Sequence, residues 1–150
     1  MCIGDRFIGL ESINPDALMG ARKKQNKVAE YRKMLLEWKR AGATIFAGYI
    51  VGFPSDTPES VMRDIGIIQR ELPIDLLEPH CLTPLPGSED HQKLHKAGAY
   101  LDPDLNKYDL EHVTTPHATM SPEQWQQLYH DSWTAFYSPE HLEMCIRDSD

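Results

Sequence analysis

The run "TIFAGYIV", Thr44 to Val51, limits the folds open to this chain more than any other stretch of its sequence. It is almost continuously apolar and half of its residues are β-branched. A run of this kind is typical of a strand that is covered on both faces. Such strands belong to parallel sheets whose connections are helices. The run therefore predicts an α/β fold.

Helical patterns lie on both sides of this central run. The segment 25–41 has apolar residues spaced three and four apart and ends before Gly42. The segment 57–70 repeats the pattern with Val61, Ile65 and Ile68 on one side. Each pattern predicts a helix with one buried face.

Two shorter apolar runs predict the outer strands. They are 6–10 and 74–82, and the second is expected to be broken at Pro79. The order strand, helix, strand, helix, strand predicts a parallel sheet with right-handed crossovers. Three such strands would leave two unpaired sheet edges, which favour association.

The pattern loosens after Ser88. We expect a short helix over 89–98, a loop rich in proline and aspartate over 101–120, and a final helix over 121–137 with Ser121 as its N-cap. Five aromatic residues at helical spacing in the final helix predict a core-facing side, or a wall of a ligand site: Trp125, Tyr129, Trp133, Phe136 and Tyr137.

Composition limits the partners. The formal charge of −8 over 150 residues argues against binding to nucleic acid or to anionic membranes, since both need a basic surface. The longest weakly polar run, 41–53, is too short to span a bilayer. We therefore predict a cytoplasmic protein without a membrane span.

The two ends of the sequence resemble each other. "MCIGDR" at the start and "MCIRDS" near the end share four residues in register. We interpret residues 1–6 and 144–150 as foreign to the protein. In that case Cys81 is the one native cysteine, and the natural ends of the protein lie elsewhere.

All three predicted strands lead into loops rich in glycine, proline or small polar residues. These loops are "GLES", "VGFPSDT" and "LTPLPGS". In parallel α/β folds, ligands bind where the carboxyl ends of strands enter such loops. The bland alternative is that these residues only end the strands.

These motifs carry a resemblance to a known family. "FIGLES", "AGATIFAGYIVGFPSDTPES" and "LTPLPGS" resemble, in order and spacing, the second half of a radical S-adenosylmethionine (SAM) enzyme core. "YDLEHVTTPHATMSPEQWQQLYHDSWTAFYSPE" is similar to the C-terminal extension of those radical SAM enzymes that carry a cobalamin-binding domain. The resemblance implies a partial (β/α) barrel. Residues 7–90 would form its last three strand-helix units and residues 91–143 a helical extension.

The resemblance also implies which residues contact SAM. Glu11 or Ser12 would bind the ribose hydroxyls, and Ile50 and Gly52 would pack on the adenine. Backbone groups near the adenine edge would come from Leu82, Thr83 and Pro84. Three alternatives stay open: Glu11 as a surface or capping acid, Ile50 as a core residue, and Lys23 or Lys24 as solvated charges rather than partners of the SAM carboxylate.

The chain departs from the family in its cysteines. The family holds a [4Fe-4S] cluster with the motif C-x3-C-x2-C, and Cys2, Cys81 and Cys145 are not so spaced. The resemblance implies that the missing N-terminal half of the protein binds the cluster. The parent enzyme would cleave SAM reductively and act on a small-molecule substrate, by methylation or cyclisation and with cobalamin in one branch. This chain alone is predicted to be inactive.

Other interpretations remain. His91 and His95 have a spacing that can bind a metal ion but lack a third ligand nearby. His80 and Cys81 point from the third strand toward the predicted site, or pack in the core. The chain could also be half of another α/β barrel that binds a phosphorylated ligand, or a non-catalytic binding or dimerisation module.

Overall fold

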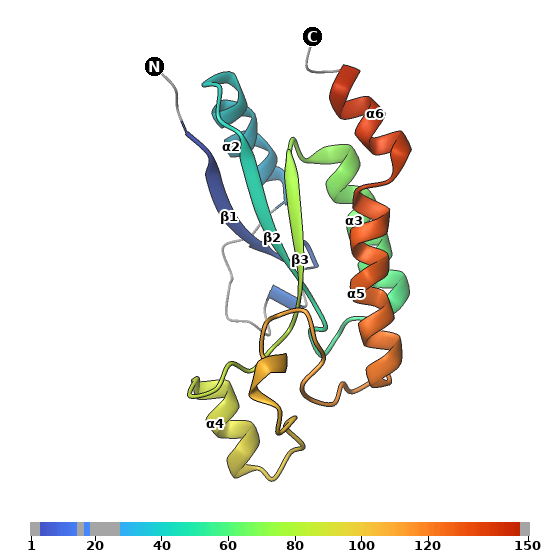
Figure 1. Ribbon diagram of the computed structural model, residues 1–150. Helices are drawn as coiled ribbons and strands as arrows, with labels where there is room; N and C mark the ends of the chain where they lie inside the picture. Colours follow the sequence, from blue (N-terminus) through green and yellow to red (C-terminus); the bar gives the residue numbers. More distant parts are fainter. Residues whose placement is uncertain (1–3, 15–16, 19–27, 148–150) are drawn as a thin grey trace.

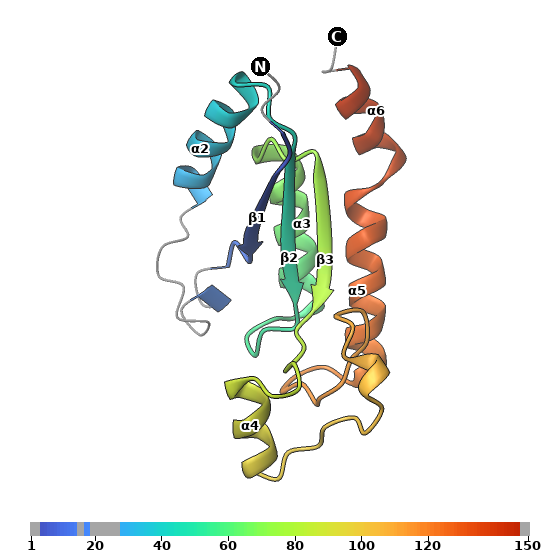
Figure 2. The same ribbon diagram turned by 60° about the vertical axis from the view of Figure 1, so that its left-hand side comes forward.

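The computed structural model describes residues 4–14, 17–18 and 28–147. Its centre is a sheet of three parallel strands in the order β1 (Arg6–Glu11), β2 (Ile45–Val51) and β3 (Leu76–Cys81). All three arrows point the same way in Figure 2. The α/β fold class predicted from the sequence is confirmed, and the arrangement is consistent with part of a β/α barrel.

The helices follow the predicted order. They are α2 (Val28–Arg40), α3 (Pro58–Glu71), α4 (Glu89–Lys96), the 3-10 helix η1 (Leu105–Lys107), α5 (Pro122–Phe136) and α6 (Pro139–Arg147). The sequence patterns did not predict η1 or α6. The start of α5 agrees with its predicted cap, because the Ser121 side chain accepts a hydrogen bond from the backbone N–H of Gln124. None of the helices in the described residues is long and apolar enough to span a membrane.

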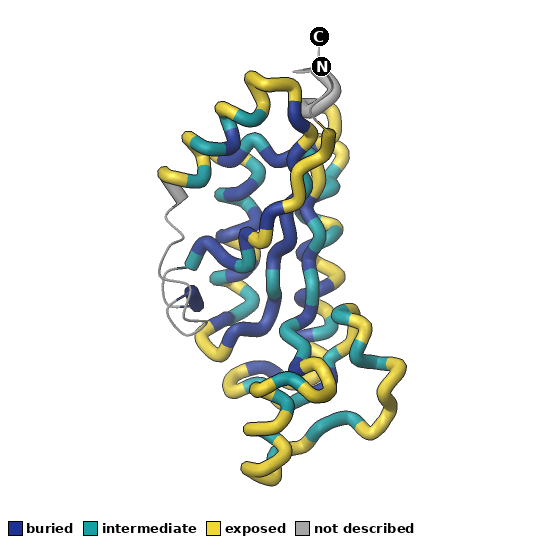
Figure 3. Tube along the Cα trace, turned by 90° about the vertical axis from the view of Figure 1, so that its left-hand side faces the viewer, coloured by how far each residue is buried: buried dark blue, intermediate teal, exposed yellow. Residues whose placement is uncertain are grey.

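One face of the sheet is buried under α2, α3 and α5. The strand residues on this covered face are Ile8, Leu10, Ile45, Ala47, Tyr49, Val51, Leu77, Pro79 and Cys81. All of them except Pro79 and Cys81 form one apolar core with Leu35 of α2, Ile65 of α3 and Trp125 of α5. Figure 3 shows this buried layer in dark blue.

The other face of the sheet, here called the open face, is not covered by any described helix. Its residues are Phe7, Gly9, Phe46, Gly48, Ile50, Leu76, Glu78 and His80, which alternate with the buried ones. All are exposed or half-buried except Gly48. In a barrel this face would point inward, toward the ligand.

Our expectation of two free sheet edges is wrong for β3. The outer edge of this strand is occupied by the C-terminal part of the chain, because the Tyr137 hydroxyl accepts from the Leu77 N–H (3.1 Å) and donates to its carbonyl (2.9 Å). The Cys81 N–H donates to the carbonyl of Leu110 (2.6 Å). No further strand can pair along these positions without displacing both residues.

Pro79 does not break the third strand, contrary to our expectation. It lies within β3, opposite Tyr49. Proline has no N–H to donate, so it is tolerated where the N–H position faces away from the neighbouring strand. Leu77 and Cys81, two residues to either side, direct their N–H groups to the same outer edge. Pro79 therefore removes a donor that no strand needs.

The outer edge of β1 differs from that of β3. The Arg6 N–H donates to Thr44 next to β2, so the alternating N–H and carbonyl groups of Phe7 and Gly9 face the other way. Within the part of the chain that the structure describes, these groups have no partner. Among the described residues, the outer edge of the sheet is thus occupied at β3 and unoccupied at β1.

The two hydrogen bonds between the Tyr137 hydroxyl and the Leu77 backbone can be tested by removing the hydroxyl oxygen. Tyr137→Phe keeps the ring but leaves the Leu77 N–H and carbonyl without their partner. We expect the free energy of unfolding to fall by roughly 1–3 kcal/mol, measured by urea denaturation. Tyr100→Phe, at a ring that is 63% exposed, is the control and should change little. Equal free energies of unfolding for both variants would show that these two hydrogen bonds do not stabilise the fold.

Candidate functional site

The carboxyl ends of the strands meet at one end of the sheet. Residues 12–14, 52–57 and 82–88 follow β1, β2 and β3 there, and Figure 1 shows α4 beyond the arrowheads. The predicted SAM contacts all lie at this end. Lys23 and Lys24, also considered as SAM contacts, lie outside the described residues.

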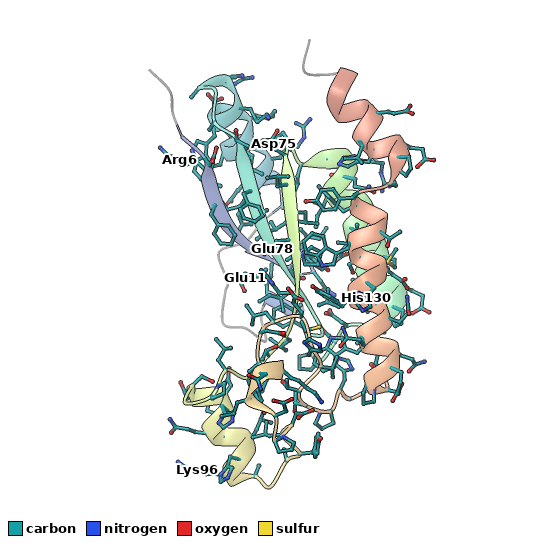
Figure 4. The ribbon with its side chains drawn as sticks, viewed as in Figure 1. Arg6, Glu11, Asp75, Glu78, Lys96 and His130 are labelled. Carbon is teal, nitrogen blue, oxygen red and sulfur yellow. The ribbon has the colours of Figure 1, made fainter. Side chains whose placement is uncertain are left out.

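Glu11 brings a carboxylate onto the open face. Its backbone is in the left-handed region (φ 64°), where a β-bulge interrupts the pairing of β1 with β2. Its Oε1 lies only 2.8 Å from where a Cβ atom on Gly9 would be. The side chain therefore folds back over its own strand, and it can do so because Gly9 has no side chain. Figure 4 labels Glu11 at the end of β1.

Ser12 lies on the opposite side of the sheet from Glu11. It is buried, its Oγ accepts from the Asn14 N–H (3.0 Å), and it interacts with the hydroxyl of Tyr49. Of the two residues proposed for the ribose, only Glu11 has its polar side-chain group on the open face.

Ile50 lies on the open face and is paired with His80 of β3. The His80 Nε2 is 3.6 Å from Oε2 of Glu78, two residues earlier on the same strand. The sequence analysis missed Glu78, although its alternation with His80 could have placed both on one face. The open-face positions thus carry one carboxylate, that of Glu78, and one histidine, with no lysine or arginine among them, and the Glu11 side chain adds a second carboxylate.

Gly52 is needed for the close packing of the strand end against α5. Its φ of 110° is unfavourable for any other residue, and a Cβ atom there would lie 2.1 Å from Cζ2 of Trp125. The same indole donates from Nε1 to the Val51 carbonyl (3.0 Å). The contact of Gly52 with adenine remains a prediction, but Trp125 alone accounts for a glycine at this position.

Asp56 organises the turn after β2. One oxygen, Oδ2, accepts from the N–H groups of Gly52 and Phe53, both at 2.9 Å. Burial raises the pKa of this carboxyl, and the two hydrogen bonds act in the other direction. The structure shows that Asp56 holds the loop from within, so these two N–H groups are not available to a ligand.

The end of β3 offers backbone groups to a ligand. The Leu82 N–H continues the sheet by donating to Val51 (2.9 Å), and the Thr83 hydroxyl donates to the Cys81 carbonyl (3.0 Å). The Leu82 carbonyl and the N–H and carbonyl of Thr83 have no partner in the described ranges. Groups of this kind suit the adenine edge, as the resemblance implied.

The described residues do not fit an iron-sulfur cluster. Cys81 is a free thiol that is 1% exposed, and burial raises its pKa to about 12. A cluster needs several thiolates together. Among the residues that the structure describes, no three histidine, cysteine or acidic side chains form a metal site. His91 instead contacts the ring of Tyr108.

A buried polar pair supports the site from the covered face. The Tyr49 hydroxyl donates to Oδ2 of Asp64 in α3 (3.3 Å). The pKa of Asp64 is raised to about 6, chiefly by burial and to a smaller extent by the nearby Asp56, while the Tyr49 hydrogen bond and the charge of Arg63 oppose the shift. Burial also raises the pKa of Tyr49.

Comparison with known proteins agrees with the α/β barrel class. The fold resembles that of Elp3 from the archaeon Methanocaldococcus infernus, with a TM-score of 0.52 and 14% identity over 85% of this chain and 35% of that one. At this identity the likeness concerns the fold alone. No protein-family model matches the chain.

Two curated enzymes are similar in sequence. Bacteriochlorophyllide d C-12(1)-methyltransferase of Chlorobaculum tepidum is 30% identical over 108 residues, which cover 70% of this chain and 22% of that enzyme. Hopanoid C-2 methylase of Rhodopseudomonas palustris is 25% identical over 136 residues, or 91% of this chain and 24% of the enzyme. The chain thus spans about a quarter of their length. These similarities support the radical SAM superfamily and do not bear on the cobalamin-associated branch.

The contact between Gly52 and Trp125 predicts an unequal response to two alanine substitutions. Gly52 and Gly87 both have positive φ, but a Cβ atom on Gly87 would meet open space. Gly52→Ala should therefore lower the free energy of unfolding by about 1–3 kcal/mol more than Gly87→Ala, because only the former forces the indole aside. Urea denaturation measures both. Equal losses would show that backbone strain alone matters.

Asp64 predicts a pH-dependent stability. Its pKa is about 6 in the folded protein against an ordinary 3.8, so the folded chain keeps a proton that the unfolded chain releases. The contribution of Asp64 to the free energy of unfolding falls as the pH rises from about 4 to about 6. Asp64→Asn removes this loss, so the variant should gain stability relative to wild type between pH 4 and pH 7.

Urea denaturation at several pH values measures that difference. Asp131→Asn, at an exposed carboxylate of α5, serves as the control and should show no such trend. A constant difference between Asp64→Asn and wild type at pH 4 and pH 7 would contradict the raised pKa.

Proposed function

We propose that this chain forms one wall of the SAM-binding site of a larger radical SAM enzyme. The observation that carries the proposal is the open face at the carboxyl end of the sheet. There a carboxylate on β1, and backbone groups after β3 that have no partner among the described residues, flank the central strand. Helices α2, α3 and α5 pack on the other face, so among the described residues the open face is the side of the sheet that a ligand can reach.

The chemistry of this face suits SAM. The carboxylate of Glu11 can accept hydrogen bonds from both hydroxyls of a ribose. The half-buried Ile50 offers an apolar surface for adenine, and the Leu82 and Thr83 carbonyls suit its amino group. SAM carries a sulfonium charge, which the two carboxylates of the open face favour over an anionic ligand.

The names of the relatives suggest the reaction class. Both are methyl-transferring enzymes, one named for a bacteriochlorophyllide and the other for a hopanoid. We propose that the whole protein transfers a methyl group from SAM to a small molecule. The described residues do not supply a nucleophile or a cluster site for that reaction. They bind and orient SAM.

The remaining cofactors belong to the part of the protein beyond these residues. Because a [4Fe-4S] cluster does not fit the described residues, we derive no step of the reaction through it. Cobalamin stays a prediction from the resemblance of the C-terminal extension. The chain alone is expected to bind SAM without releasing 5′-deoxyadenosine.

The proposal can be tested by NMR titration of the isotope-labelled chain with S-adenosylhomocysteine. This compound is what remains of SAM after its methyl group has been transferred. We expect shifts of the backbone amides of Ile50 and Thr83 at the strand ends. Glu11→Gln should weaken binding by at least about ten-fold, because a hydrogen bond to a charged group is lost.

Glu37→Gln is the matched control and should leave the affinity unchanged, since Glu37 lies on α2 and pairs with Arg40. The absence of amide shifts at the strand ends at millimolar ligand would overturn the proposed SAM site. Unchanged affinity of Glu11→Gln would remove Glu11 from it.

A further inference from the structure

We infer that His117, in the segment before α5, is a positioning residue for the SAM site, holding the 52–57 loop in its ligand-facing shape. The inference rests on the proposed function. His117 lies 64 residues from the loop in sequence, yet its Nε2 is 2.8 Å from the Phe53 carbonyl oxygen. The sequence analysis quoted the run that contains His117 but did not single this residue out.

The hydrogen bonds of His117 define its tautomer. Nδ1 lies 3.2 Å and 3.3 Å from the backbone nitrogens of Thr119 and Met120, so it must accept from these N–H groups. A neutral imidazole that accepts at one nitrogen donates at the other. The proton therefore lies on Nε2 and is directed at Phe53. The ring links the C-terminal segment to the loop through both of its nitrogens.

Neighbouring groups make the same connection. The Thr119 hydroxyl donates to the Asp56 carbonyl (3.2 Å), and Trp125 donates to the Val51 carbonyl (3.0 Å). The rings of His117 and Trp125 meet edge to face, with centroids 5.2 Å apart. The carbonyls at the start, middle and end of the loop region are each bound by a side chain from residues 117–125.

Among these three side chains, His117 is the one that binds the Phe53 carbonyl, and it is half-buried. Trp125 is fixed by burial in the core, whereas Thr119 is exposed and contributes a single hydroxyl. The Phe53 carbonyl also accepts from the Asp56 N–H (2.8 Å), which closes the turn. The second donor, from His117, ties this turn to the rest of the protein. Without it, the Phe53 carbonyl keeps only the bond from the Asp56 N–H, although Thr119 still binds the Asp56 carbonyl. Ile50 and Gly52 lead directly into this turn.

Three variants of the chain test the inference. His117→Ala removes all three hydrogen bonds, and His117→Gln retains an amide N–H able to reach Phe53. His112→Gln is the control, because His112 is exposed and pairs with Asp109 outside the loop. The measurements are the NMR shifts and hydrogen exchange of the Gly52 and Phe53 amides, and the Kd for S-adenosylhomocysteine. Urea denaturation confirms that each variant is folded under the binding conditions.

We expect His117→Ala to shift both loop amides and raise the Kd about ten-fold, as for a lost positioning contact. His117→Gln should restore most of the affinity, and His112→Gln should match wild type. If His117→Ala leaves the loop amides and the Kd unchanged, the inference is wrong. If His117→Gln behaves like His117→Ala, the ring acts by packing on Trp125 and the hydrogen-bond role is overturned.

The outcomes separate this inference from the proposed function. Failure of the wild-type chain to bind S-adenosylhomocysteine would overturn the SAM site. The loop amides would still report whether His117 holds the loop, because their shifts and exchange are measured without ligand. Normal loop amides in His117→Ala together with normal wild-type binding would overturn the inference and leave the proposed function in place.

Discussion

The contact of Trp125 with the end of the central strand connects α5 to the sheet. Its indole fills the space that a side chain at Gly52 would need and donates to the carbonyl of Val51. An aromatic ring buried in this way contributes much of the apolar contact between a helix and a sheet. Because the indole N–H is directed at the last residue of β2, the position of α5 and the direction of the chain leaving the sheet are fixed together.

The two outer edges of the sheet differ in their backbone hydrogen bonds. At β3, a tyrosine hydroxyl, a proline and a loop carbonyl account for the outward positions from Leu77 to Cys81. At β1, the described residues leave the corresponding groups without partners. Protein edges are usually blocked where no strand follows. Within the described residues, the outer edge of β3 is therefore blocked against a further strand and that of β1 is not.

Much of the fold could be predicted because it depends on local patterns. The apolar run of β2 and the spaced apolar residues of α3 determine each element from neighbouring residues alone. The position of Pro79 could not be judged in that way, since it depends on which edge of β3 faces outward. The same applies to the candidate site: Gly52 is explained by a residue 73 positions away, and His117 bonds across 64 positions. A glycine-rich loop indicates a close approach, but the sequence does not reveal what approaches it.

The open face combines two kinds of group that a ligand site needs. Glu11 reaches the face only because its backbone takes a left-handed conformation and Gly9 leaves room beneath its carboxylate. Such strain persists where the surrounding structure enforces it, and it is concentrated at functional sites. The groups after β3 are backbone atoms, whose positions follow from the sheet itself. In the proposed site, the carboxylate of Glu11, held by a strained backbone at the end of β1, and the backbone groups after β3 thus flank Ile50. The distance between them depends on the spacing of the strands and hence on the core packed beneath the strands.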